Sequence, residues 1–250
     1  MIQISISNSV GGGGGNLSSG GSSFENLYSF AFDGNVDAIN CGNVPTFNGV
    51  TNGSISAWFK STSGGNFISK FLKTGTKQFL VQFLSTKIDV YGSGLGFRST
   101  DTVTWLDGNW HHFALSYDAS RVANQRFKVY IDKVPLTNLV GLNGPTSLAS
   151  ATNDLLIGDR DGIQVHWTGN IDEVALFTTS LDAAQVAALY DNGPTDLSGE
   201  SGLVNWWRMG DKATFDAGTG NWTLVDQGSG GNNATTVSMP EASRQADVPT

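Results

Sequence analysis

The chain has few charged residues and almost no cysteine. Only 14% of its 250 residues are charged, and Cys41 is its single cysteine. One cysteine excludes an intrachain disulfide and favours synthesis in a reducing cytoplasm. No Lys or Arg precedes Lys60 and no long apolar run occurs, so we expect neither a secretory signal peptide nor a membrane span. The net charge of -8 argues against nucleic-acid binding, which needs a positive surface.

Acidic residues are missing from one long stretch of the chain. Residues 38–88 contain none, although five lysines occur there: Lys60, Lys70, Lys73, Lys77 and Lys87. Lysines on solvated strand edges discourage aggregation, which is one interpretation. The other is a basic patch that docks an acidic partner.

Glycine and aromatic residues, by contrast, are abundant. The chain has 32 glycines, and 10% of its residues are aromatic. Short alternating segments separated by turn residues occur throughout the middle of the chain, for example at residues 55–59, 78–84, 110–117 and 126–132. This pattern predicts an all-β sandwich of antiparallel strands. One short helix is expected after Asp182, because Gln185 completes a capping box and Gly193 followed by proline ends the segment.

The two ends of the chain differ from its middle. Ile2, Ile4 and Ile6 alternate with polar residues, and a glycine- and serine-rich stretch follows to residue 23. We expect residues 1–23 to be a flexible arm whose isoleucine strand adds to a neighbouring subunit, so that the protein forms a homo-oligomer. Simple terminal disorder is the alternative. Residues 24–194 are expected to form the sandwich, and residues 195–250 a closing segment that packs back on it.

Six segments resemble the laminin-G-like jelly rolls of the concanavalin A-like lectin/glucanase superfamily. In chain order they are FDGNVDAI (32–39), SISAWF (54–59), DGNWHHFA (107–114), FKVYID (127–132), GNIDEV (169–174) and LDAAQVAALY (181–190). Lys133 replaces the glycine that usually follows the fourth. The resemblance implies a jelly-roll sandwich of two antiparallel sheets over residues 24–194.

A seventh segment of this family stands in an unusual place. Residues 202–211 (GLVNWWRMGD) and 226–234 (DQGSGGNNA) resemble a segment that usually precedes the body. Here it follows the body, as in virion structural proteins of bacteriophages. This similarity leads to a first hypothesis of a non-enzymatic capsid decoration or fibre protein that is located in the virion and contacts a capsid protein. The alternative is a glycan-binding adhesin or lectin module, and a glycoside hydrolase is a further alternative.

The resemblance also implies candidate sites. Related domains hold a structural calcium ion through carboxylates at positions that match Asp33 and Asp172, and oxygen ligands suit this hard cation. Sugar binding on such sandwiches uses exposed aromatic rings, for which Trp105, Trp167 and Trp222 are the candidates because they lie near turns. Glucanases of the superfamily need a carboxylate pair, but Asn170 stands where the first glutamate would be. No catalytic residue is therefore assigned.

Overall fold

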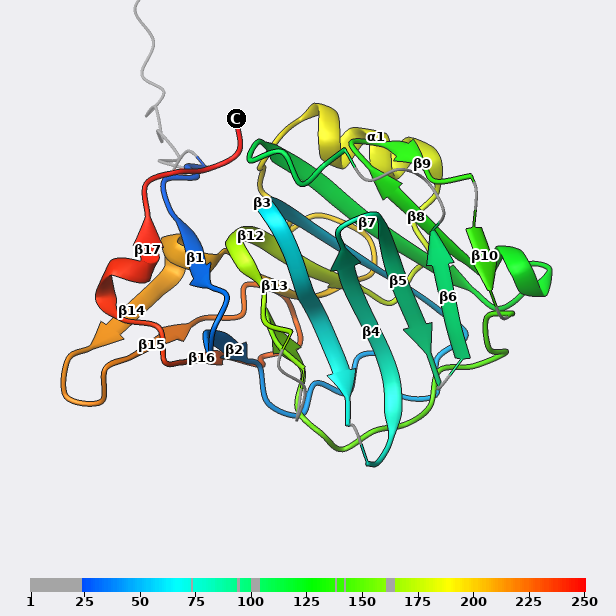
Figure 1. The fold of residues 1–250 in the computed structure, drawn as a ribbon, viewed down its shortest axis with the longest axis horizontal. Coiled ribbons are helices and arrows are strands. Elements are labelled where there is room, and N and C mark those ends of the chain that lie inside the picture. Colours follow the sequence, from blue (N-terminus) through cyan, green and yellow to red (C-terminus); the bar gives the residue numbers. More distant parts are fainter. Residues whose placement is uncertain are drawn as a thin grey trace, which may run out of the picture.

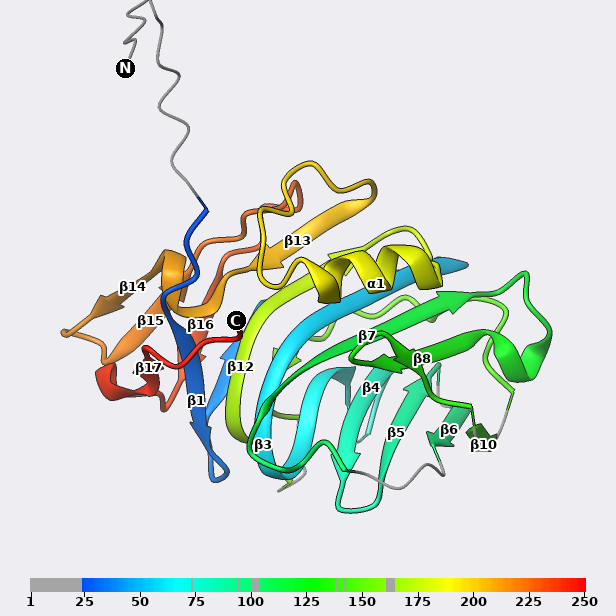
Figure 2. The ribbon, with the colours of Figure 1, turned by 90° about the horizontal axis from the view of Figure 1, so that it is seen from above.

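The computed structural model describes residues 24–72, 74–93, 95–99, 104–137, 139–141, 143–160 and 165–250. Two antiparallel sheets pack face to face, with one short α-helix on the outside (Figures 1 and 2). The predicted all-β jelly-roll sandwich is confirmed. The proposed assembly residues Ile2, Ile4 and Ile6 lie outside the described part of the chain. None of the helices in the described ranges is long and apolar enough to cross a bilayer.

The back sheet is formed around two long neighbouring strands. Its strands are β1 (Ser29–Asp33), the first half of β3 (Asn52–Phe71), β7 (Trp110–Asp118), β8 (Phe127–Ile131), β9 (Val134–Pro135), β12 (Thr168–Phe177), β13 (Leu203–Trp207) and β17 (Arg244–Gln245). They run in the order β9, β8, β7, β3, β12, after which β1 pairs with one end of β12 and β13 with the other.

The front sheet faces the viewer in Figure 1. Its strands are β2 (Ala38–Asn40), the second half of β3, β4 (Lys77–Leu84), β5 (Lys87–Gly92), β6 (Leu95–Ser99), β10 (Leu139–Gly141), β11 (Leu156–Ile157), β14 (Ala213–Asp216), β15 (Asn221–Leu224) and β16 (Ala234–Val237). The order is β10, β6, β5, β4, β3, β11, β2, β16, β15, β14.

Strand β3 belongs to both sheets because it bends at two glycines. Gly64 and Gly65 have φ angles of 80° and 137°, a region that residues with a Cβ atom rarely adopt. A Cβ atom on Gly65 would lie 2.2 Å from the carbonyl oxygen of His166. The bend therefore lets the segment that precedes β12 pass directly against β3.

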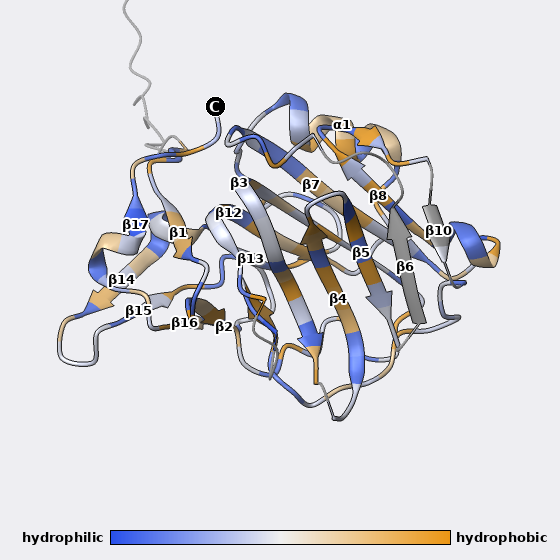
Figure 3. Cartoon of the chain, viewed as in Figure 1, coloured by the Kyte–Doolittle hydropathy of each residue, from blue (hydrophilic) through white to orange (hydrophobic). Residues whose placement is uncertain are grey.

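The core between the sheets is aromatic. Phe59, Phe67, Phe83 and Trp167 form a cluster with ring centroids 4.8 to 5.9 Å apart. Strands β4 and β5 contribute a row of hydrophobic residues to this layer (Figure 3). Burying one such ring stabilises the fold by about 1.5–3 kcal/mol, so the alternation of the strand residues determines which face turns inward.

Helix α1 (Ala183–Asp191) covers the outer face of the back sheet, as Figure 2 shows. The predicted capping box is present, since Asp182 accepts hydrogen bonds from two backbone amides and Gln185 bonds back to the Asp182 amide. Val186 and Leu189 pack against the sheet. Three short 3₁₀ helices occur at Ala123–Gln125, Met209–Lys212 and Glu241–Ser243.

The last 50 residues contribute strands to both sheets. Adjacent residues of a strand point to opposite faces, and the two indoles of β13 follow this rule. Trp207 enters the core between the sheets, whereas Trp206 packs on the outer side, stacked on Phe24 at 6.2 Å. Near the C-terminus, the carboxylate of Asp247 accepts hydrogen bonds from Lys60 and Trp110.

Candidate functional site

Two of the three tryptophans predicted to stack on sugars are buried. Trp167 is 0% and Trp222 is 3% exposed. Trp167 fills the aromatic core, and Trp222 packs edge-on against Phe30 and donates its Nε1–H to the carbonyl of Pro240. The prediction for these two residues is wrong because both rings turn inward from the ends of strands, which places them in the core.

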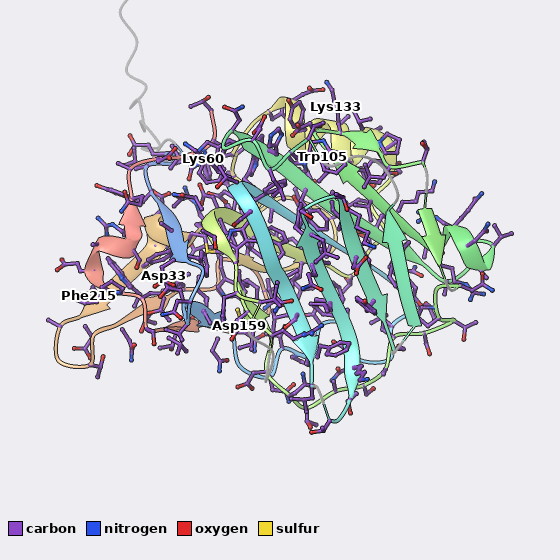
Figure 4. The ribbon with its side chains drawn as sticks, viewed as in Figure 1. Asp33, Lys60, Trp105, Lys133, Asp159 and Phe215 are labelled. Carbon is purple, nitrogen blue, oxygen red and sulfur yellow. The ribbon has the colours of Figure 1, made fainter. Side chains whose placement is uncertain are left out.

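Trp105 is half-buried and packs against the edge of the core. Figure 4 places it at the upper middle of the molecule, whereas Asp33 and Phe215 lie towards the left end. The three predicted tryptophans therefore do not form one binding surface.

The predicted calcium ligands Asp33 and Asp172 do not converge. Asp33 is paired with Thr168 across β1 and β12, and Asp172 lies four residues further along β12. At about 3.3 Å per strand residue, their backbones are about 13 Å apart. Asp33 is exposed, whereas Asp172 is fully buried. The pair does not fit one calcium ion, and no group of three or more His, Cys, Asp or Glu side chains in the described residues is arranged to hold a metal.

Asp172 and its neighbour Glu173 instead form hydrogen bonds to the segment before β1 and to the end of β13. The pairing of β12 with β3 shifts register between Asp172 and Ala175, and Glu173 in this bulge has a φ angle of 50°. Asp172 accepts a hydrogen bond from the Asn26 amide at 3.0 Å. Glu173 accepts from Trp206 Nε1 at 2.5 Å and from Arg208 Nε at 3.2 Å. Burial raises the pKa of Asp172 well above its usual range and that of Glu173 to about 7.

A hollow of about 380 Å³ lies beside this cluster. Arg208 and Trp206 line it from below, and Phe24, Asp196, Lys212 and Gln227 line its sides. The Arg208 guanidinium stacks on Phe24 at 4.0 Å and also donates to the carbonyl of Glu25. Arg208 is thus already engaged by groups of the protein itself, and these contacts hold the segment around residues 24–28 in place.

A second polar surface covers the outer face of the front sheet, which we call the front face. Cross-strand partners share a face of a sheet. One row consists of Asn66, Gln82 and Asp89 from β3, β4 and β5. In the next row, Leu80 of β4 lies opposite Tyr91 of β5. None of these five side chains belongs to the core cluster between the sheets, so the front face carries polar and aromatic groups that the sandwich core does not use.

Asn66 is the most informative residue of the front face. It is 0% exposed, yet neither its Nδ2 nor its Oδ1 has a hydrogen-bond partner within the described residues. The backbone N–H of Asn66 donates a hydrogen bond to the backbone carbonyl of Val165 at 2.9 Å. The segment before β12 therefore lies over Asn66. Beside it, His166 Nδ1 lies 3.0 Å from Asp159 Oδ1. A buried side-chain amide without partners is costly, and a buried water molecule is a common way to satisfy such a group.

Aromatic rings and cations gather further along the same face. The rings of Phe71 and Tyr91 meet edge to face at 6.2 Å. Lys77 Nζ lies 5.4 Å and Arg160 Cζ 5.2 Å from the centroid of the Phe71 ring. Phe71 is only 9% exposed, because these two cations and Tyr91 cover it. The arrangement places two cations and the Tyr91 ring around Phe71 on this face.

Of the front face, sequence reasoning named only lysines of the acid-free stretch and missed Asn66, Gln82 and Tyr91. The pattern of β4 held a signal, since Gln82 alternates with Val81 and Phe83 and must face away from the core. That Asn66 lies beside Gln82 follows only from the register of β3 against β4, which shifts next to Asn66. Such a bulge is not visible in the residue pattern.

The family model described as the concanavalin A-like lectin/glucanases superfamily (Laminin_G_3) matches residues 33–187, more than half of the chain. The chain belongs to this family. Its matched region includes the strands β3, β4 and β5 that build the front face, whereas β13 to β17 lie beyond it. No curated protein sequence matches the chain.

Two solved structures share the fold of this laminin-G-like chain at low identity. One is a protein from Bacteroides ovatus whose assignment to carbohydrate binding is itself provisional; it has a TM-score of 0.67 and 16% identity over 90% of this chain. The match spans 62% of the length of that protein. The other is a heptameric SAP-like pentraxin from Limulus polyphemus, with a TM-score of 0.52 and 16% identity over 66% of this chain and 82% of its own.

Proposed function

We propose that this laminin-G-like chain is a glycan-binding module and that the front face is its binding site. The observation that carries the proposal is Tyr91, a half-buried residue on the front face whose ring meets Phe71 edge to face at 6.2 Å. Gln82 lies in the neighbouring row of the same face. Side-chain amides both donate and accept hydrogen bonds, which matches the mixed character of neighbouring sugar hydroxyls.

The aromatic part of the front face supports the same proposal. Tyr91 is half-buried and presents both a ring and a hydroxyl, and its hydroxyl lies 3.4 Å from Asp89 Oδ2. An amphipathic ring suits a ligand that is apolar on one side and polar on its edges, as a pyranose is. Ligand sites combine apolar surface with a few placed polar groups in this way.

The comparison with solved structures supports a glycan ligand more than the virion hypothesis. The Bacteroides ovatus relative is assigned to carbohydrate binding, and it covers 90% of this chain. At 16% identity the likeness supports the fold directly and the ligand only by analogy. Location in a virion, contact with a capsid protein and self-association through the N-terminal arm remain predictions.

We further propose binding rather than catalysis. A retaining glycosidase needs two carboxyl groups about 5 Å apart that both reach the substrate. The adjacent acids of β12 do not offer this, because Asp172 is fully buried and Glu173 is engaged by Trp206 and Arg208. Their raised pKa values follow from burial in this structural cluster.

The experiment compares two tyrosines on opposite sides of the sandwich. Binding of the full chain to a panel of neutral and acidic polysaccharides is measured first, and calorimetry then gives Kd for the best ligand. We expect Tyr91→Ala to weaken binding about fivefold to tenfold, which corresponds to one lost aromatic contact. Tyr190→Ala is the matched control, since Tyr190 belongs to helix α1 on the other side of the sandwich, where it stacks on Trp58.

Gln82→Ala tests the polar row in the same assay, and we expect a loss of similar size. Circular dichroism of each variant shows whether it is folded. Unchanged Kd in both front-face variants, or no binding to any polysaccharide of the panel, would overturn the proposal.

A further inference from the structure

The acid-free stretch of the sequence does not fold into one basic patch. Lys60 pairs with Asp247 at the C-terminal segment, at 2.8 Å. Lys70 turns into the protein, where it is 1% exposed and donates to Asn43 Oδ1 and the carbonyl of Val44. Lys73 lies outside the described residues. Of this set, Lys77 and Lys87 reach the front face.

Lys77 meets a second cation there that lies far away in the sequence. Arg160 follows β11 and stacks on the same ring, so that Lys77 and Arg160 both lie within 5.4 Å of the Phe71 centroid. The Nε atom of Arg160 is buried and has no hydrogen-bond partner in the described part of the chain. Two like charges on one ring repel each other, and a shared anion would relieve that repulsion.

The surroundings of these two cations contain charges of both signs. Lys70 lies in the same strand as Phe71, and burial lowers its pKa to about 8, so it stays mainly charged at neutral pH. The acid next to Arg160 in the chain is Asp159, whose Oδ1 lies 3.0 Å from His166 Nδ1. The charge of Asp159 also acts on Arg160 and that of Asp154 acts on Lys70, so these acids offset part of the positive charge.

We propose that the front face selects acidic glycans and that Lys77 and Arg160 together hold a carboxylate or sulfate group of the sugar. This inference rests on the proposed glycan-binding function and adds the chemical class of the ligand. A guanidinium offers donors in a fixed fork that matches a carboxylate or sulfate, and an ammonium adds a mobile point charge. Tyr91 supports the adjoining sugar ring, and Gln82 lies in the neighbouring row of the face.

The decisive test uses two ligands that differ only in charge. The probes are oligogalacturonate and the same oligosaccharide after its carboxyl groups have been reduced to primary alcohols, together with heparin oligosaccharides as the sulfated probe. We expect at least one acidic probe to bind at low salt about tenfold or more tightly than the neutral oligosaccharide, and its affinity to fall as salt is raised.

Variants then locate the contact. Lys77→Gln and Arg160→Gln are each expected to weaken binding of the acidic probe about tenfold. Lys128→Gln is the matched control, because Lys128 is exposed on β8 of the back sheet. It should leave Kd within about twofold.

The outcomes separate the two proposals. If the neutral oligosaccharide binds as tightly as the acidic probes and Tyr91→Ala weakens it, the selection of acidic glycans is wrong and the glycan-binding function stands. Acidic binding that is weakened equally by Lys128→Gln and Lys77→Gln would be diffuse electrostatic attraction and would also overturn the inference. If no probe and no polysaccharide binds, both proposals fail.

Discussion

Replacement of His112 should remove a large part of the acid sensitivity of this protein. His112 is 1% exposed, and its Nε2 lies 2.9 Å from the Ser56 hydroxyl under helix α1. Burial lowers its pKa to about 4, although the charge of Asp132 acts in the opposite direction. The folded protein thus binds fewer protons at this residue than the unfolded chain does between pH 6.5 and pH 4.

The sign and the size of the effect follow from this difference. Stability contributed by neutral His112 is present above pH 6.5 and is lost as the pH falls towards 4. The folded and unfolded pKa values differ by about 2.5, and each pH unit corresponds to about 1.4 kcal/mol, so the full loss is about 3.5 kcal/mol, of which about 3 kcal/mol falls between pH 7 and pH 4. Glu173 acts in the opposite sense, because burial raises its pKa to about 7 and its effect opposes folding as the pH rises.

Urea unfolding at pH 7 and at pH 4, followed by tryptophan fluorescence, measures the effect. The free energy of unfolding of His112→Gln should fall between these pH values by about 3 kcal/mol less than that of the native protein. Glu173 is present in both proteins and cancels in the comparison. His111→Gln should change the acid loss in the opposite direction. Burial lowers the pKa of His111, but its bonds to Asp132 and Asp107 outweigh burial and raise it. An equal acid loss in the native protein and in His112→Gln would refute the reasoning.

Three further outcomes are expected. Gly65→Ala should destabilise the fold by about 1–3 kcal/mol in urea unfolding. The φ angle of Gly65 is 137°, and the new Cβ would lie 2.2 Å from the His166 carbonyl oxygen. An unchanged unfolding midpoint would contradict this. Trp207→Ala should cost about 3–5 kcal/mol, since its ring is fully buried, and a loss below about 1 kcal/mol would show that the site collapses. Asp172→Ala should lower Tm equally with calcium and with chelator, because Asp172 bonds within the protein and lies apart from Asp33; a shift seen only with calcium would restore the metal site.

The elements that the sequence predicted are those that depend on local chemistry. The capping box at Asp182 and Gln185 involves groups three residues apart, so its hydrogen bonds form wherever the helix forms. The adjacent rings of Trp206 and Trp207 had to face opposite sides, and the sandwich covers both. The all-β class follows in the same way, because alternation and turn residues act within each strand.

The predicted sites depended on distant parts of the chain and were mostly wrong. Trp167 lies near a turn, as an exposed ring would, but the bend at Gly64 and Gly65 brings its segment against β3 and places the ring in the core. Asp33 and Asp172 each match a family position, but the register of β1 against β12 sets them about 13 Å apart.

The sequence by itself determined the fold class, the position of the helix and the inward rows of the strands. Strand pairing, register and the course of the segment before β12 were decided only in the tertiary structure. The front face shows the reason, since Asn66, Gln82 and Tyr91 come from three strands and Arg160 from a segment beyond β11. A strand reveals which residues share its face, but which strands become neighbours depends on how the sheets bury their apolar surface together.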